Sequence, residues 1–135
     1  MRNSRASAEK IKLLFGMCFA LFLGSCGSSP TVTWKESSIS PDKRWVATAR
    51  SEIIGGMGGQ FDQTIVTMTE DDRDNTTKEI LILSHEYPTI NLSMRWVSPT
   101  NLLIKYAESG RPGDKIIVNF RAITYGGASI SVDGR

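Results

Sequence analysis

Apolar and polar residues alternate along most of the chain after Thr33, with the period of two that is typical of half-buried β-strands. The cleanest alternation lies within residues 90–96, whose apolar positions are Ile90, Leu92, Met94 and Trp96. No stretch of helical length in this part of the chain keeps its apolar residues on one face with a 3.6-residue period. The pattern therefore predicts an all-β domain.

About seven or eight short strands are expected, separated by turn segments rich in Pro, Gly, Asp and Asn. The expected strands are 31–37, 45–53, 64–69, 80–83, 90–96, 102–106, 116–121 and 129–132. Residues 80–83 are apolar on both faces, as in a central strand that is covered from both sides. These strands predict a small antiparallel meander or sandwich, with one core that contains Leu92, Met94, Trp96, Ile116, Val118 and Phe120.

Two segments of the chain share one order of features. Each opens on a Ser-Pro pair, Ser40-Pro41 or Ser98-Pro99, and continues with a strand, a Gly-containing loop and a second strand. Two blade-like β units in tandem would produce this order, and so would a plain antiparallel meander. The turn at Ser40-Pro41-Asp42-Lys43 resembles the Ser-Pro-Asp-Gly-Lys turn of TolB-type propeller blades, without its Gly. Because each blade needs about 40 residues, the chain is too short for a closed propeller.

The chain ahead of the β domain has the features of an export signal. Residues 1–12 are polar with a positive excess, and residues 13–23 are apolar apart from Gly16 and Cys18. This apolar run is shorter than the roughly 20 residues that a helix needs to cross a bilayer. We therefore expect an N-terminal signal helix that is removed from the mature protein.

The segment Leu23-Gly24-Ser25-Cys26 resembles the lipobox of bacterial lipoproteins. The resemblance implies cleavage between Ser25 and Cys26 and the attachment of acyl chains such as palmitate to Cys26. Several buried acyl chains make such an anchor effectively permanent, since each buried methylene contributes about 0.8 kcal/mol. Ordinary secretion with cleavage near Ser25 or Ser28 is the alternative interpretation.

The lipobox also implies a domain organisation and a location. We expect a lipoprotein signal peptide in 1–25, a lipidated cysteine with its tether in 26–32, and a single β domain in 33–135. Inner-membrane lipoproteins commonly carry Asp after the lipidated Cys, so Gly27 favours the outer membrane, with the domain facing the periplasm. Residues from about Ser38 to Tyr106 also resemble small bacterial envelope domains with a Ser-Pro-Asp turn and a double-Gly loop, a resemblance that brings no activity with it.

The composition excludes several classes of function. The chain has 16 basic and 14 acidic residues, of which Arg2, Arg5, Lys10, Lys12 and Glu9 precede the cleavage point. The remaining 12 basic and 13 acidic residues give residues 26–135 a net charge of about −1, so nucleic-acid binding has no electrostatic support. Cys18 and Cys26 are the only cysteines, and neither is left for a disulfide or a thiolate metal site in the domain. No cofactor is expected.

Two groups of polar residues suggest chemistry, and a simpler interpretation is favoured for each. His85 is the only histidine, and its neighbour Glu86 would allow acid-base catalysis. Successive side chains of a strand point to opposite faces, so His85 and Glu86 would not act together, and we expect His85 to be a surface residue at a strand end. The acidic segment 70–74 could hold calcium, but it departs from the EF-hand pattern, and an exposed charged turn is favoured.

Two further features could form a binding surface. The segment Gly55, Gly56, Met57, Gly58 and Gly59 should interrupt the strand before it and is the candidate binding loop, because Met57 is an adaptable apolar contact. A plain hairpin tip is the favoured interpretation of this segment. Trp34, Trp45 and Trp96 could line a sugar-binding platform, although Trp96 shares its face with Leu92 and Met94 and is expected to pack in the core.

These observations support three hypotheses about function. The leading hypothesis is a non-enzymatic envelope lipoprotein, held at the membrane through Cys26, whose β domain binds an envelope protein. The first alternative is an immunity-type lipoprotein that inhibits a periplasmic toxin. The second alternative is a small envelope hydrolase that uses His85 and a nearby carboxylate.

Overall fold

The computed structural model describes residues 29–56, 59–71, 76–86, 90–108, 111 and 115–135. These residues form nine β-strands and no helix, so the prediction of an all-β domain is confirmed. The strands are β1 (Thr31–Ile39), β2 (Trp45–Gly56), β3 (Gly59–Glu70), β4 (Thr77–His85), β5 (Asn91–Ser98), β6 (Asn101–Ala107), β7 (Ile117–Arg121), β8 (Thr124–Tyr125) and β9 (Ala128–Gly134).

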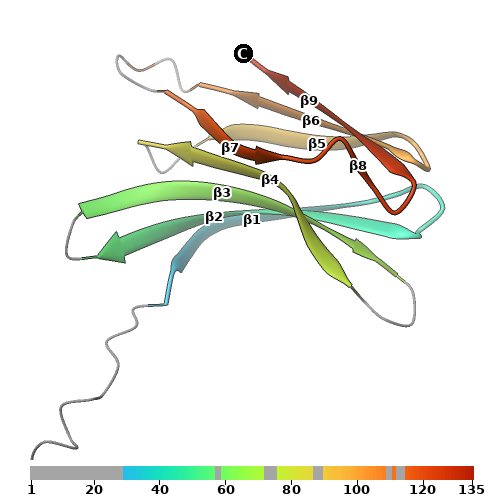
Figure 1. Ribbon diagram of the computed structural model, residues 1–135, viewed down its shortest axis with the longest axis horizontal. Helices are drawn as coiled ribbons and strands as arrows, with labels where there is room; N and C mark the ends of the chain where they lie inside the picture. The colour runs from blue at the N-terminus through green and yellow to red at the C-terminus, as the bar shows by residue number, and fades with distance from the viewer. Residues whose placement is uncertain (1–28, 57–58, 72–75, 87–89, 109–110, 112–114) are drawn as a thin grey trace, which may run out of the picture.

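The strands form two sheets that pack face to face as a sandwich (Figure 1). Sheet A has the order β1-β2-β3-β4-β7, and all of its neighbouring strands are antiparallel. Sheet B has the order β5-β6-β9-β8, in which β6 and β9 are parallel. The chain therefore crosses from sheet A to sheet B after β4, returns for β7, and crosses again before β8.

The core lies between the two sheets and is filled by alternate residues of their inner faces. Every second residue of the first half of β2 is fully buried, beginning with Trp45, Ala47 and Ala49. Sheet A also contributes Val66, Met68, Leu81 and Leu83 to the core, and sheet B contributes Leu92, Met94, Leu102, Ile104, Ala128 and Ile130. The predicted core positions Leu92 and Met94 are buried, and Trp96 and Ile116 pack against the core from its margin.

The prediction that Val118 and Phe120 belong to this core is wrong. Val118 is 43% exposed and Phe120 is 45% exposed. Both residues lie on β7, which is the edge strand of sheet A, so neighbouring strands cover it from one side only. A bulge in β7 also ends the alternation, since Leu83 pairs with Val118 while the adjacent Ile82 pairs with Phe120. Val118 and Phe120 therefore lie on opposite faces, although they are two residues apart.

The glycine-rich segment does not interrupt the sheet in the way that its composition predicts. β2 continues through Gly55 to Gly56, and β3 begins at Gly59, which pairs with Gly56. Long pairing between β2 and β3, from Trp45↔Glu70 onward, holds these glycines in the ladder despite their low strand propensity. Met57 and Gly58 lie outside the described residues.

The interpretation of the chain as two blade-like units does not describe the observed sheets. In the first unit, β2 and β3 are paired neighbours, as a blade requires. In the second unit, β6 belongs to sheet B and β7 belongs to sheet A, so the corresponding strands do not pair. The shared order of turn, strand and loop thus reflects the general pattern of antiparallel proteins.

The signal helix, the lipobox and Cys26 fall within residues 1–28, outside the described part of the chain. The first strand begins at Thr31, two residues before the expected start of the domain. Among the residues that the structure describes, no helix is long and apolar enough to cross a membrane.

Candidate functional site

The Ser-Pro-Asp turn joins β1 to β2 and is closed by its own polar groups. The Lys43 amide donates to the Ser40 carbonyl at 2.8 Å, which closes a β-turn with Pro41 at its second position. The Ser40 hydroxyl donates to Asp42 Oδ1 at 2.6 Å, and the Arg44 amide donates to the same oxygen at 3.2 Å. These bonds, with the Ser40 hydroxyl first, lower the pKa of Asp42 below its usual range.

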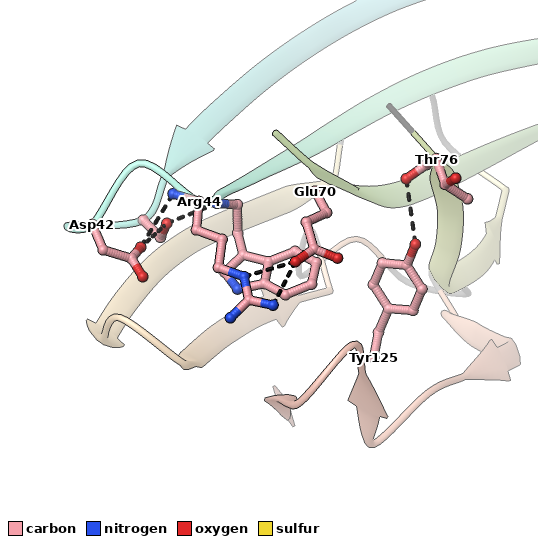
Figure 2. Close-up of polar contacts among 7 residues, drawn as sticks. Asp42, Arg44, Glu70, Thr76 and Tyr125 are labelled. Carbon is pink, nitrogen blue, oxygen red and sulfur yellow. Dashed lines mark hydrogen bonds and ion pairs between the residues drawn. The ribbon is translucent and has the colours of Figure 1, made fainter. Parts of the chain in front are cut away.

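The same turn fixes Trp45, the largest fully buried side chain of the described residues. The Trp45 amide donates to the Ser40 hydroxyl at 2.9 Å, and the Tyr125 ring packs edge-on against the indole with 5.7 Å between ring centroids. Arg44 lies over the outer side of the indole and pairs with Glu70 at 2.5 Å (Figure 2). These contacts hold Trp45 in place. Because Tyr125 belongs to sheet B, they also hold the β1–β2 corner against that sheet.

The three tryptophans do not form an exposed platform. Trp45 has no exposed surface, and Trp34 and Trp96 are half-buried against the core. The Trp96 indole donates to the Ser38 carbonyl at 3.2 Å, which links sheet B to β1 of sheet A. Packing of the sandwich accounts for all three residues, as expected for Trp96 from its alternation.

His85 is buried, and its prediction as a surface residue is wrong. It is 5% exposed and lies on the inner face of sheet A, where its Nε2 is 2.8 Å from the Thr64 hydroxyl. The Thr64 hydroxyl is in turn 2.8 Å from the hydroxyl of Ser51, which is also buried. The polar side chains of three adjacent strands thus satisfy one another, and this is why a histidine can lie inside the sandwich. Glu86 is exposed and lies just after the end of β4.

Asp62 lies beside His85 in the antiparallel register and is 6% exposed. Its Oδ1 is buried and has no hydrogen-bond partner among the described residues. The carboxylate that the hydrolase hypothesis requires near His85 is therefore Asp62 rather than Glu86. However, Thr64, the hydroxyl in contact with His85, has no exposed surface for a substrate to reach.

The acidic segment 70–74 is only partly described. Glu70 belongs to β3 and pairs with Arg44, so its carboxylate already has a cationic partner. Asp71 is exposed, and Asp72 and Asp74 lie outside the described residues. The part of the chain that the structure describes contains no group of three or more His, Cys, Asp or Glu side chains that could hold a metal ion.

The described residues have their most distinctive surface at β7. Ile117, Val118 and Phe120 are exposed by 53%, 43% and 45%, and all three lie on a five-residue strand at the end of sheet A. In Figure 1, β7 borders β4 and leads directly into the crossing to β8. One side of the β7 backbone pairs with β4, and no described strand pairs with the other side. An edge that exposes both apolar side chains and unpaired backbone groups is suited to binding another strand.

Bulge geometry spreads the apolar side chains over both faces of β7. Val118 is on the inner side with Leu83, whereas Phe120 is on the outer side with Ile82. Asn119 occupies the bulge between them, and its side chain donates to the Ser84 hydroxyl at 2.5 Å. A shallow depression on the outer face is lined by Thr77, Lys78, Glu79, Ile82 and Phe120. We refer to residues 115–121 as the β7 edge.

Both ends of the β7 edge are positively charged. Lys115 precedes the strand and Arg121 ends it, and both are exposed. Neither forms an ion pair with another described residue. The β7 edge therefore combines an apolar centre with a cation at each end. The sequence pattern predicted Ile116, Val118 and Phe120 as core residues and therefore did not indicate this surface, although apolar residues on both faces of the strand between two cations were a visible signal.

Comparisons with family models, curated proteins and solved structures found no match to this chain.

Proposed function

We propose that this chain is a lipid-anchored, non-enzymatic binding protein of the bacterial envelope, and that its sandwich captures an envelope protein close to the membrane. In this proposal Cys26 carries the lipid, and the β7 edge contacts the partner. Gly27 supports an outer-membrane position with the domain facing the periplasm.

The observation that carries the binding role is the exposed apolar strand at the edge of sheet A. Ile117, Val118 and Phe120 place apolar surface in solvent on both faces of one strand. Natural sheets usually protect such an edge with charges, prolines or a covering segment, because exposed strand edges pair with other chains. A partner that covers β7 would remove this apolar surface from water, at about 25 cal/mol per Å².

The proposed anchor would hold the sandwich within a short distance of the bilayer. β1 begins at Thr31, five residues after Cys26. Five residues span at most about 18 Å when fully extended, which is less than the thickness of a bilayer core. This short tether favours a partner that is itself in or near the membrane.

Lipid attachment is tested by feeding cells a labelled fatty-acid analogue that lipoproteins incorporate. We expect wild-type protein and Cys18→Ala to be labelled, because Cys18 lies inside the apolar leader. Cys26→Ala should lose the label and accumulate as the unprocessed precursor. Normal labelling of Cys26→Ala would remove the anchor from the proposal.

The binding role is tested in the same cells with a photo-crosslinking amino acid. We expect the probe at position 117 to capture a specific protein after illumination. A probe at position 97 is the matched control, because Val97 is 60% exposed on β5, the edge strand of the other sheet. Equal capture from both positions, or capture from neither, would contradict the assignment of the β7 edge. Capture of a toxin would assign the immunity role to the same surface.

A further inference from the structure

We infer that the β7 edge binds its partner by strand addition, and that the partner segment is an extended, apolar stretch with an acidic residue near each end. This inference rests on the proposed binding function and specifies the chemistry of the partner. It follows from the backbone of β7, from the side chains on its two faces, and from the charges at its ends.

The backbone of β7 is suited to pairing with a further strand. It continues a five-stranded sheet whose other strands are all antiparallel, and its outer side is unpaired among the described strands. An added strand would make ladder hydrogen bonds with groups that otherwise bind water. Because side chains alternate between faces, the added strand would place apolar residues beside Val118 on one face and beside Ile117 or Phe120 on the other.

Charge complementarity decides what must lie at the ends of the added strand. Lys115 and Arg121 are six residues apart, which corresponds to about 20 Å of extended chain. Opposite charges across neighbouring strands stabilise their pairing, whereas like charges weaken it. Two further charges line the depression beside Phe120, those of Lys78 and Glu79 on β4, and they are of opposite sign and offset each other. An extended segment with Asp or Glu near both ends therefore fits the β7 edge best.

The same charges disfavour a second copy of this chain as the occupant. In an antiparallel pairing of two β7 strands, the Lys115 end of one copy meets the Arg121 end of the other. In a parallel pairing, each cation meets its own counterpart. Both in-register arrangements of two β7 strands therefore bring cations together at both ends, which a heterologous acidic segment avoids.

The test uses the full-length protein in detergent micelles and synthetic seven-residue peptides of alternating valine and threonine. One peptide ends in glutamate on both sides, and its partner peptide ends in lysine on both sides. We expect the glutamate-ended peptide to bind about tenfold more tightly by fluorescence anisotropy, since two favourable cross-strand charge pairs replace two unfavourable ones. The double variant Lys115→Glu with Arg121→Glu should reverse this preference.

Two controls separate strand addition from charge attraction alone. In the first control, two glutamate-ended peptides are N-methylated on alternate residues, each on the set that the other leaves free. Each peptide then lacks the amide donors of one strand edge, so the peptide that is methylated on the edge facing β7 should lose binding. In the second control, Phe120→Asp should reduce binding at least tenfold. Phe120→Thr is a second variant, which removes the aromatic ring but retains a strand-forming residue. Val97→Asp is the matched control, an exposed valine of the other sheet, and should bind as wild type does.

Several results would overturn the inference. Equal binding of the two peptides, or unchanged binding of both methylated forms, would exclude strand addition by an acidic segment. Dimerisation of the protein in light scattering, abolished by Phe120→Asp, would identify a second copy as the occupant. If crosslinking at position 117 still captured a cellular protein in any of these cases, the binding function would stand and only the proposed partner chemistry would fail.

Discussion

Gly126 lies directly against the indole ring of Trp45, with no room for a side chain between them. A Cβ at position 126 would overlap Cη2 of Trp45, and the next two ring carbons would be 3.2 and 3.3 Å away. Gly126 also has a φ of 56°, in the left-handed region that favours glycine. The turn between β8 and β9 thus closes over the residue that the Ser-Pro-Asp turn fixes from the other side.

Gly126→Ala should lower the free energy of unfolding by about 2–4 kcal/mol, because overpacking and left-handed backbone strain add. Gly127 provides the matched control, since its φ is 87° and a Cβ added there would have no neighbouring atom within 4 Å. Gly127→Ala should lower the free energy of unfolding only by the left-handed backbone strain, about 1–2 kcal/mol. Urea unfolding followed by circular dichroism measures both variants. Equal losses in the two variants would show that contact with Trp45 adds nothing.

Lys43→Gly should stabilise the protein by about 0.5–1 kcal/mol. Lys43 has a φ of 62°, in the left-handed region, which is costly for a residue with a Cβ. The relief of strain exceeds the entropy that glycine adds to the unfolded chain. Lys35→Gly, an exposed lysine in the middle of β1, should instead destabilise by about 0.5–1 kcal/mol. Thermal unfolding distinguishes the two signs, and a loss of stability in Lys43→Gly would refute the argument.

The Ser-Pro-Asp turn should make stability depend on pH. The Ser40 hydroxyl lowers the pKa of Asp42 below its value in the unfolded chain, about 3.9. The ionised carboxylate therefore stabilises the folded state fully at pH values above the pKa of Asp42 in the unfolded chain. This contribution is lost as the pH falls through the lower pKa of Asp42 in the folded protein. Unfolding at pH 7 and pH 3 should show a smaller drop in stability for Asp42→Asn than for wild type. An identical drop would exclude Asp42 from the acid response.

The buried hydroxyl of Thr64 offers a fourth prediction. Thr64→Val keeps the shape of the side chain but removes the hydroxyl that lies between Ser51 and His85. Leaving buried polar groups without this partner should cost about 1–3 kcal/mol. Thr69→Val is the control, because Thr69 and Thr77 form the same kind of hydroxyl pair at the surface, and its cost should stay within about 0.5 kcal/mol. Similar losses in both would mean that burial of the pair is unimportant.

Period-two alternation was sufficient to predict the strands whose two faces differ. On β5 it placed Leu92 and Met94 inside correctly, and it also predicted the strand that contains Trp45. It could not predict the parallel pairing of β6 with β9, because register between distant segments leaves no local pattern. Signal-peptide features concern residues outside the described part of the chain, so the lipid anchor at Cys26 and the binding loop at Gly55–Gly59 stay predictions.

The errors in the predicted site have two physical causes. His85 follows an apolar run near a strand end, where a polar residue is normally exposed, and only the tertiary structure reveals that Thr64 and Ser51 supply its buried partners. Phe120 and Val118 have the spacing of core residues, but a bulge places them on opposite faces of an edge strand. Sequence pattern alone identifies neither a bulge nor an edge.

The exposed position of β7 leads to a final prediction about stability. Phe120→Ala should lower the free energy of unfolding by only about 1 kcal/mol, because roughly half of the side chain is already in water. Leu102→Ala, at a fully buried position of β6, should cost about 2–5 kcal/mol, through lost burial and the cavity that remains. Urea unfolding of both variants gives the comparison. A loss in Phe120→Ala as large as that in Leu102→Ala would show that Phe120 belongs to the core, and the β7 edge would then have no apolar surface to offer a partner.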